Sequence, residues 1–526
     1  MGDTSILTAK FLRYLAKKSW ALGGEYYQCR DIATGDPVVR LRMADVDDAL
    51  LAVDEARLAQ ISWWKSGVKG RQKVFRDLGR LLLQHEDTLV DLTCLLTGKT
   101  REDARIEYSQ GVNAESYYVR LSSRAFQERY FEGVFPGLSR PRVEYNALGV
   151  VGVFSAPEMP LYSSLIDALQ PLVAGNAVLH FVDAQTAPVM YALRDLAWAA
   201  GMPVGLLHII PSDSTDLGEN VIQLLDHVTF SGSTEIGYEV APIAHEAFVT
   251  TSLFLSTINT AIIMDDAQVD YEEMLQTLLF NTGQSTQCIQ RIYVQPGLYP
   301  QVLAHLTERF QDKTPSATGE ESPEQIGSLF SENKLESCMR LVDDAVDAGA
   351  TLVTGGRPRP DIAPFFYEPT ILTSVPEGAQ INREQIQGPV VVIEEMRDVH
   401  EVIATVADSP YRFLTAILTR NVAWARSIRS SLEHGVVLIN ETNCMQWPVW
   451  MTPVARNREA GAGVRFGLEG IRQYTRLCSS DERSISLSEI AKKICSDQLC
   501  RQLHLNFYAA MNGIYKPKNY SWHRPR

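Results

Sequence analysis

The stretch Asn281-Thr-Gly-Gln-Ser-Thr-Gln-Cys-Ile-Gln-Arg291 is the part of the sequence that most strongly indicates the fold. A helix-like apolar pattern over 272–279 precedes it, and the apolar run Ile292-Tyr-Val294 follows it. Loops held between rigid elements carry many of the catalytic groups of enzymes. We therefore expect a reactive group in this loop, in which Thr286 offers a hydroxyl and Cys288 a thiol.

Composition excludes several classes of protein. The chain has 526 residues, enough for about three domains, and its net charge of -14 argues against a nucleic-acid surface. Its eight cysteines form no Cys-x-x-Cys pair, so neither a disulfide framework nor a metal site is expected. No run of 18 apolar residues is present, and the N-terminus shows no leader pattern. We expect a cytoplasmic protein with no membrane partner.

Apolar spacing predicts the main elements. From 44 to 118 the apolar residues recur at helical spacing, and Gly98 is expected to end one of these helices. A further helix is predicted over 332–348. Runs rich in apolar and β-branched residues predict strands at 142–145, 149–154, 206–210, 228–230 and 436–440.

Several motifs resemble those of the aldehyde dehydrogenase superfamily, with succinate-semialdehyde dehydrogenases as the similar branch. Asn281, Gly283, Gln284 and Arg291 fit the family's Asn-x-Gly-Gln-x-Cys loop and the arginine that follows it. Ser231-Gly-Ser-Thr-Glu-Ile-Gly237 is similar to the family's pyrophosphate loop, in which N–H groups at a helix N-terminus face phosphates. The resemblance covers about residues 25–478.

The resemblance implies an α/β aldehyde dehydrogenase fold. It places a Rossmann-like, former NAD-binding domain at 1–125 and 154–255, and a former catalytic domain at 256–467. A small β oligomerisation extension is expected at 126–153 and 468–480, which implies a homodimer or homotetramer. A basic, aromatic tail at 481–526 contains a possible capping box at 486–489. We expect this tail to dock on its own body or on a neighbouring subunit rather than on a membrane.

The same alignment places unusual residues at chemical positions. Thr286 stands where the family has its nucleophilic cysteine, Phe254 where it has the general base, and Glu158 where an asparagine holds the oxyanion. A threonine hydroxyl needs a base to become a nucleophile, a phenyl ring moves no proton, and an oxyanion needs donors. The contacts to the two cofactor riboses and to the nicotinamide ring are replaced by Phe181, Ala184, Gln385 and Gln387. We therefore expect no cofactor, or only weak NAD(P) binding, with Gly232, Ser233 and Gly237 as a vestigial cofactor-binding loop.

The residues that differ from the family pattern lead to three hypotheses about the function. The favoured hypothesis is a non-redox enzyme, an isomerase or cyclase of an apolar small molecule, in which Glu158 acts as the acid. Its pocket would contain Met159, Tyr162, Cys288, Met445, Trp447 and Trp450. The alternatives are a non-catalytic scaffold or partner subunit of an active relative, and an atypical NAD(P)-dependent aldehyde dehydrogenase. If Glu158 is only structural, its expected ion-pair partner is Arg291 or Arg456.

Overall fold

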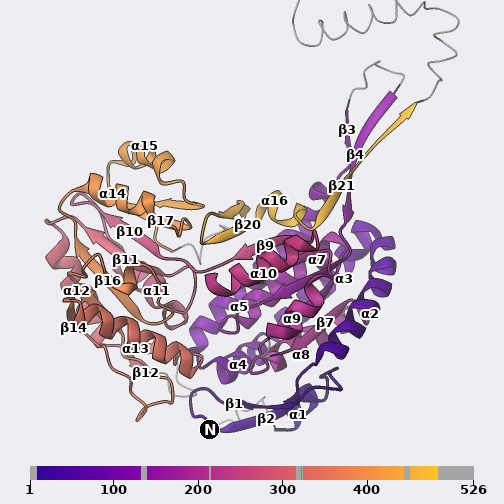
Figure 1. The fold of residues 1–526 in the computed structure, drawn as a ribbon, viewed down its shortest axis with the longest axis horizontal. Helices are drawn as coiled ribbons and strands as arrows, with labels where there is room; N and C mark the ends of the chain where they lie inside the picture. Colours follow the sequence, from indigo (N-terminus) through magenta and orange to yellow (C-terminus); the bar gives the residue numbers. More distant parts are fainter. Residues whose placement is uncertain are drawn as a thin grey trace, which may run out of the picture. The chain divides into compact units, whose positions relative to one another are not determined.

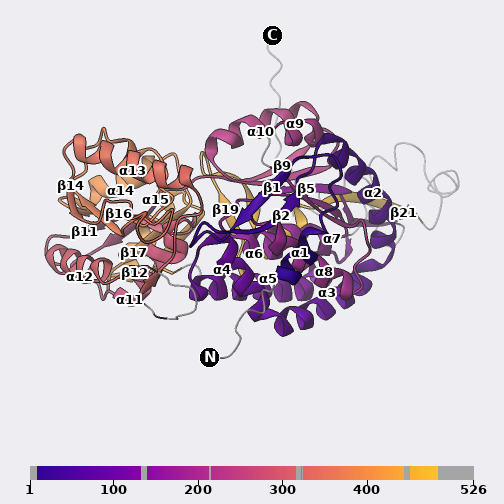
Figure 2. The same ribbon diagram turned by 90° about the horizontal axis from the view of Figure 1, so that it is seen from below.

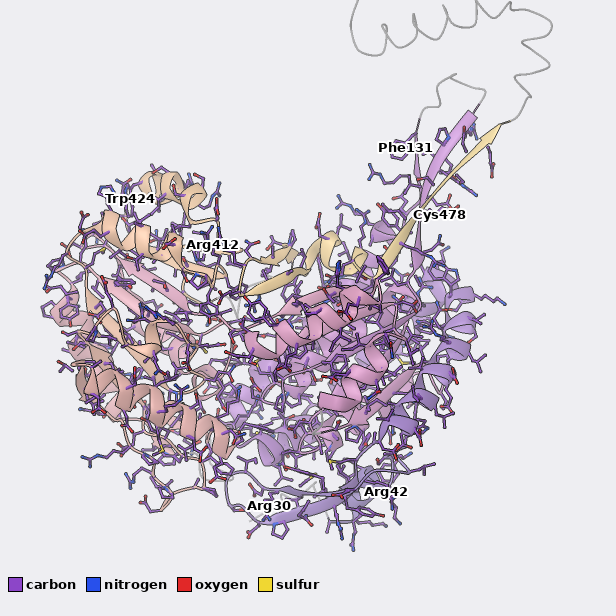
Figure 3. The ribbon with its side chains drawn as sticks, in the orientation of Figure 1. Arg30, Arg42, Phe131, Arg412, Trp424 and Cys478 are labelled. Carbon is purple, nitrogen blue, oxygen red and sulfur yellow. The ribbon has the colours of Figure 1, made fainter. Side chains whose placement is uncertain are left out.

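The structure is a computed structural model that describes residues 9–131, 139–212, 215–315, 322, 324–443 and 451–483. Its contacts divide the chain into one unit of Met1–Ala125 with Ala147–Thr475 and a second of Phe126–Asn146 with Arg476–Arg526. Figures 1 and 2 show the ribbon with its elements labelled, and Figure 3 adds the side chains.

A run of long helices opens the first unit, as the apolar spacing predicts. Gly98 ends α4 in the left-handed conformation, with φ 72°, so the predicted stop is confirmed. Asp45 and Asp48 form a capping box at the start of α2. The elements are α1 (Ala9–Ala16), the hairpin β1 (Tyr26–Arg30) and β2 (Pro37–Arg42), α2 (Val46–Lys65), α3 (Gly67–Gln84), α4 (Glu86–Thr97) and α5 (Arg101–Ala125).

The first large sheet has seven strands among the described residues, in the order β19-β20-β9-β8-β5-β6-β7. Its five strands from β9 to β7 are parallel, and β5 and β6 are almost wholly buried, which suits a sheet covered by helices on both faces. The predicted strands at 149–154, 206–210 and 228–230 are confirmed. The bounds are β5 (Val150–Phe154), β6 (Ala177–Val182), α8 (Ala187–Ala199), β7 (Leu207–Pro211), α9 (Thr215–Ile222), β8 (His227–Ser231), α10 (Thr234–Glu246) and β9 (Thr250–Phe254).

The strand pairing assigns two segments of the chain to other domains than the sequence predicts. The strand β5 belongs to the first large sheet and not to the small extension, because it pairs with β6 and β8. β19 (Val454–Arg456) and β20 (Gly461–Arg465) also join this sheet through β9, although they follow the second sheet in the chain. Apolar patterns predict strands but do not indicate which strand each will pair with.

The second large sheet also has seven strands in the described chain, in the order β14-β15-β16-β11-β10-β17-β18. All are parallel except β14 at the edge. The predicted helix over 332–348 and the strand over 436–440 are confirmed. The bounds are β10 (Asn259–Ile263), α11 (Tyr271–Leu279), η2 (Phe280–Gly283), β11 (Ile289–Val294), α12 (Tyr299–Gln311), β12 (Thr314–Pro315), β13 (Gln325–Ile326), α13 (Glu332–Asp347), β14 (Thr351–Thr354), β15 (Thr370–Thr373), η3 (Gln380–Asn382), β16 (Val390–Glu395), α14 (Val399–Asp408), β17 (Leu414–Leu418), α15 (Val422–Leu432) and β18 (Val436–Ile439), with α16 (Gly467–Arg472) after β20.

The second unit contains a three-stranded sheet within its described residues. β21 (Thr475–Arg483), β4 (Ser139–Ala147) and β3 (Arg129–Tyr130) lie in that order, and Arg142 donates to Ser480 across it. The expected tail helix and capping box lie outside the described residues. None of the helices described in either unit is long and apolar enough to cross a membrane.

The segment after β5 contains an irregular helix. It runs through α6 (Pro160–Tyr162), the π-helix η1 (Ser163–Ala168) and α7 (Leu169–Ala174). Lys99 and Glu107 form a fully buried ion pair that holds the start of this segment. Lys99 Nζ donates to the Glu158 carbonyl at 2.7 Å, and Glu107 Oε1 accepts from the Tyr162 N–H at 2.9 Å. Residues 158–162 are therefore fixed at both ends.

Replacing Lys99 with Met should lower the free energy of unfolding by about 3–5 kcal/mol, because the Glu107 carboxylate stays buried without its counter-charge. Urea denaturation of the parent and the variant measures this difference.

Two further variants control this prediction. Lys99→Met with Glu107→Gln should recover at least half of the loss, because the amide oxygen still accepts from Tyr162. Arg80→Met, which breaks an exposed pair with Asp77, should cost less than about 1 kcal/mol. Equal losses for Lys99→Met and Arg80→Met would contradict the prediction.

Candidate active site

A small pocket lined mainly by residues with polar side chains, called the polar pocket below, lies where the loop after α11 meets the segment after β5. Its cavity volume is about 60 Å³, which suits a small group such as a carbonyl and its neighbours. Widely separated segments of the chain contribute to it. The lining residues are Ala156, Glu158, Met159, Tyr162, Ser163, Asp167, Ser231, Gly232, Phe254, Gln284, Ser285, Thr286, Gln287, Gln387 and Arg465.

The loop that leads to Thr286 has a strained backbone. Asn281, Thr282 and Gly283 are all left-handed, with φ of 51°, 57° and 72°. A β-branched residue rarely adopts this conformation. A Cβ at Gly283 would lie 2.1 Å from the Gly388 carbonyl oxygen, so only glycine fits there. Strain of this kind persists where surrounding contacts enforce it, and it clusters at functional sites.

Thr286 is held at both its backbone and its side chain. Its carbonyl accepts hydrogen bonds from Thr257 Oγ1 at 2.7 Å and from Asn259 Nδ2 at 2.9 Å. Its hydroxyl accepts from Arg456 Nη2 at 3.2 Å. The Arg456 guanidinium also lies 3.5 Å from the centre of the Phe413 ring. Thr286 therefore lines the pocket, and its hydroxyl lies beside a buried cation.

Glu158 lines the same pocket with a buried carboxylate. Its Oε1 lies 3.4 Å from Lys334 Nζ of α13, and within the described structure its Oε2 is buried with no hydrogen-bond partner. The expected pairing with Arg291 or Arg456 is wrong, because Arg291 donates to Asn382 and Arg456 donates to Thr286. An unpaired buried oxygen in a pocket can accept a proton from a bound molecule.

Asp167 and Arg465 form a second buried ion pair on the pocket wall. Arg465 Nε donates to Asp167 Oδ1 at 2.9 Å, and its Nη2 donates to Asp167 Oδ2 at 2.6 Å and to Ser231 Oγ at 2.8 Å. Burial opposes the charge of the guanidinium, but Asp167 raises the pKa of Arg465 above its ordinary value. The same guanidinium lies 3.8 Å from the centre of the Phe254 ring, a cation–π contact.

The structure brings together some of the residues singled out in the sequence and separates others. Glu158, Met159, Tyr162, Gly232, Phe254 and Thr286 all line the polar pocket. Cys288 does not line it, and its thiol donates to the Phe280 carbonyl at 3.4 Å. Burial raises the pKa of the Cys94 and Cys338 thiols to about 12, so neither offers a thiolate. Met445, Trp447 and Trp450 lie outside the described residues.

Ser233 and Gly237 do not line the polar pocket. Both residues stabilise the helix α10. The Ser233 side chain caps α10 by accepting from the Ile236 N–H. A Cβ at Gly237 would lie 2.6 Å from the Leu255 side chain, so this glycine allows close packing of the helix. No sequence pattern indicates a role for Asp167, Lys334 or Arg465, because their roles depend on contacts between distant segments.

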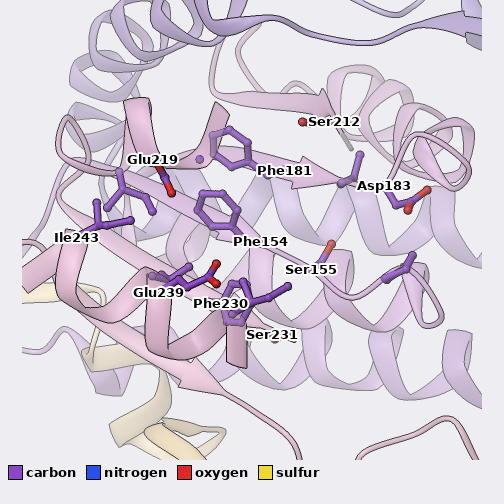
Figure 4. A pocket seen from close by; sticks show the side chains of 16 residues that line it. Phe154, Ser155, Phe181, Asp183, Ser212, Glu219, Phe230, Ser231, Glu239 and Ile243 are labelled. Atoms are coloured by element: carbon purple, nitrogen blue, oxygen red, sulfur yellow. The ribbon is translucent and has the colours of Figure 1, made fainter. Parts of the chain in front are cut away.

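A second pocket, called the aromatic pocket below, lies at the carboxyl ends of β5, β6, β7 and β8 (Figure 4). Its cavity volume is about 280 Å³, and the rings of Phe154 and Phe181 stack in it at 4.3 Å between centres. Ligands of open parallel sheets bind at this edge. The lining residues are Phe154, Ser155, Pro157, Phe181, Val182, Asp183, Ser212, Gly218, Glu219, Ile222, Phe230, Ser231, Ile236, Glu239, Val240 and Ile243.

Comparisons with known proteins found similar sequences and similar folds. The model of the aldehyde dehydrogenase family matches residues 20–479. A Mycobacterium ulcerans protein named for succinate-semialdehyde dehydrogenase activity with NADP(+) is 31% identical over 450 residues, which is 85% of this chain and 86% of that protein. A solved NADP-dependent enzyme of E. coli has a TM-score of 0.83 and 25% identity, over 88% of this chain and 96% of that one. A solved NAD+ complex of an aldehyde dehydrogenase from Bacillus cereus has a TM-score of 0.82 and 25% identity, over 88% and 94%.

These findings contradict two expectations drawn from the sequence. A non-redox isomerase or cyclase is not supported, and neither is a cofactor-free protein, because the similar proteins are named for dehydrogenase activity with NADP(+), for NADP dependence, or as an aldehyde dehydrogenase in complex with NAD+. Nothing in the comparisons favours a scaffold. The sequence shows which residue occupies each position, but not which residues from distant segments lie beside it in three dimensions. From its sequence match over 20–479, the chain belongs to the aldehyde dehydrogenase family.

Proposed function

We propose that this chain is an atypical NAD(P)-dependent aldehyde dehydrogenase that acts on a small polar aldehyde. The observation that carries the proposal is that the polar pocket and the aromatic pocket share Ser231, at the carboxyl end of β8. A dinucleotide in one pocket and an aldehyde in the other would then meet at this residue. The name of the mycobacterial relative makes succinate semialdehyde the first substrate to test.

The residues present fit a nicotinamide dinucleotide. The aromatic pocket has a flat apolar wall for the adenine, formed by the ring of Phe181 and by Ile222, Val240 and Ile243 of the flanking helices. The N-terminus of α10 follows Ser231 and Gly232, and helix N-termini favour phosphate groups. Gly232 lines the polar pocket, toward which the nicotinamide would extend. When bound, the dinucleotide supplies the acceptor for the hydride that leaves the aldehyde carbon.

Thr286 and Glu158 would perform the covalent chemistry on the protein side. Thr286 Oγ1 adds to the aldehyde carbon, and Glu158 Oε2 accepts the proton that leaves the hydroxyl. Arg456 beside the hydroxyl favours the developing negative charge on that oxygen. After hydride loss the acyl group is an ester of Thr286. Once the first proton has left to solvent, Glu158 takes a proton from the water that hydrolyses this ester.

Arg465 would stabilise the oxyanion formed when Thr286 adds. Its bonds to Asp167 and Ser231 use Nε and Nη2, which leaves the two N–H groups of Nη1 for the aldehyde oxygen. Donors fixed before the reaction stabilise a developing oxyanion most effectively. The bidentate Asp167 contact fixes this guanidinium, and so Arg465 can replace the donor that the family draws from the Glu158 position.

Two further features stay predictions. We propose a homo-oligomer built through the small sheet of β3, β4 and β21, and a cytoplasmic location in which the cysteines remain reduced. None of the described cysteines forms a disulfide, which is consistent with such a location.

Thr286→Val should reduce aldehyde-dependent formation of NADH or NADPH by on the order of 10³-fold or more, as expected when an essential nucleophile is lost. Thr286→Ser should retain activity, because it keeps the hydroxyl. Spectrophotometric assay with succinate semialdehyde measures both variants. Cys288→Ser is the matched control, and its rate of NADH or NADPH formation should stay within a few-fold of the parent's. If Cys288→Ser is inactive while Thr286→Val is active, the nucleophile is the Cys288 thiol.

Glu158→Gln should reduce kcat by roughly 10²–10⁴-fold, because the amide cannot accept the proton from Thr286. The KM should change little, since the side chain keeps its shape. Steady-state kinetics with saturating cofactor test this, and Glu336→Gln on the exposed face of α13 controls for charge. A Glu158→Gln enzyme with the parent's kcat would exclude this carboxylate as the base.

A further inference from the structure

The aromatic pocket has negative charge around its apolar wall. Asp183 follows β6, Glu219 belongs to α9 and Glu239 to α10 (Figure 4). None of the described residues that line this pocket is Lys, Arg or His. The pocket therefore offers acceptors to a hydroxyl group and no cation to a phosphate.

The position of these carboxylates relative to the rings indicates what they would contact. Glu219 of α9 and Glu239 of α10 line the same pocket as the stacked Phe154–Phe181 pair, so an adenosine held on these rings would lie in one cavity with both carboxylates. A ribose 2′-hydroxyl can donate to a carboxylate. In other dinucleotide-binding folds a carboxylate holds this hydroxyl, whereas an arginine accommodates a 2′-phosphate.

We infer that the aromatic pocket selects NAD over NADP, through the charges of Glu219 and Glu239. The inference rests on the proposed function, since it assumes that adenosine binds there. It separates this chain from its mycobacterial relative, which is named for NADP(+). A 2′-phosphate carries about 1.5 to 2 negative charges at neutral pH and is repelled by like charges nearby. Specificity of this kind arises from a repulsive contact with the excluded ligand.

The solvent exposure of the two glutamates makes the repulsion depend on salt. Both side chains are exposed in the described structure, so ions screen them over a Debye length of about 10 Å at 0.1 M ionic strength and about 3 Å at 1 M. The preference for NAD should therefore be at least about 10-fold in dilute buffer and should shrink as salt is added. A preference set by shape alone would not change with salt. Asp183 has a further backbone role, because its Oδ1 accepts from the Gln185 N–H at 2.7 Å.

Calorimetry on the full chain tests the inference with whole cofactors and with fragments. The ligands are NAD, NADP, adenosine 5′-monophosphate and adenosine 2′,5′-bisphosphate, each titrated at low and high salt. We expect tighter binding of NAD than of NADP and of the monophosphate than of the bisphosphate. The double variant Glu219→Gln with Glu239→Gln should gain affinity for NADP and the bisphosphate by about 10-fold while its affinity for NAD changes less than threefold.

Glu235→Gln is the matched control, because this exposed glutamate lies on α10 but does not line the pocket. It should leave the ratio of the NAD and NADP affinities unchanged. Equal affinities for NAD and NADP in the parent, or the same shift in the control as in the double variant, would overturn the inference. Binding of neither dinucleotide would instead overturn the proposed function. A fragment preference in the parent that the double variant does not reduce would show that other groups set the selectivity.

Discussion

The buried ion pair of Lys99 and Glu107 is the interaction on which the site depends most. Two charges removed from water are costly unless their remaining hydrogen-bonding groups are satisfied. Here those groups are satisfied by the backbone of the pocket wall, at the Glu158 carbonyl and the Tyr162 N–H. The pair thereby joins α5 to the segment after β5. Gly98, in its left-handed conformation, places Lys99 directly after the end of α4.

The polar pocket is assembled from segments that lie far apart in the chain. Glu158 follows β5, Ser231 ends β8, Phe254 ends β9, and Arg465 ends β20. The π-helix at 163–168 aligns Asp167 with Arg465, and such helices often mark functional sites. Asp167 faces Arg465 and Glu158 faces Lys334, so both carboxylates on the pocket wall have a counter-charge nearby.

The sequence predicted the fold well and the site only in part. Apolar spacing predicted the helices α2 to α5 and the strands β5, β7, β8 and β18, because local burial determines both patterns. The motif residues Asn281 and Gly283 were matched to the family, and they form part of the left-handed backbone before Thr286. Lys334 gave no local signal. It reaches Glu158 from α13, far away in the sequence, and no local pattern indicates which cation a buried carboxylate will meet.

The conclusion that the chemistry had been lost failed for a related physical reason. Glu158 in place of an oxyanion donor looks unfavourable while it is considered alone, because a carboxylate repels an alkoxide. In the structure Arg465 lies on the same wall with its guanidinium fixed by Asp167, and it can supply the missing donors. A residue type at one position limits what that residue does. It does not limit what a neighbour from another strand does in its place.

The loop before Thr286 has a backbone conformation that costs free energy. Left-handed non-glycine residues such as Asn281 and Thr282 cost on the order of 1–3 kcal/mol each. That cost is a large share of the roughly 5–15 kcal/mol by which most proteins are stable. The loop nevertheless keeps this conformation. Asn281 Nδ2 donates to the Glu158 carbonyl, and Thr257 and Asn259 hold the Thr286 carbonyl. Strain of this size persists only where the surrounding structure over-determines the backbone, so these contacts fix the place of Thr286 at the pocket.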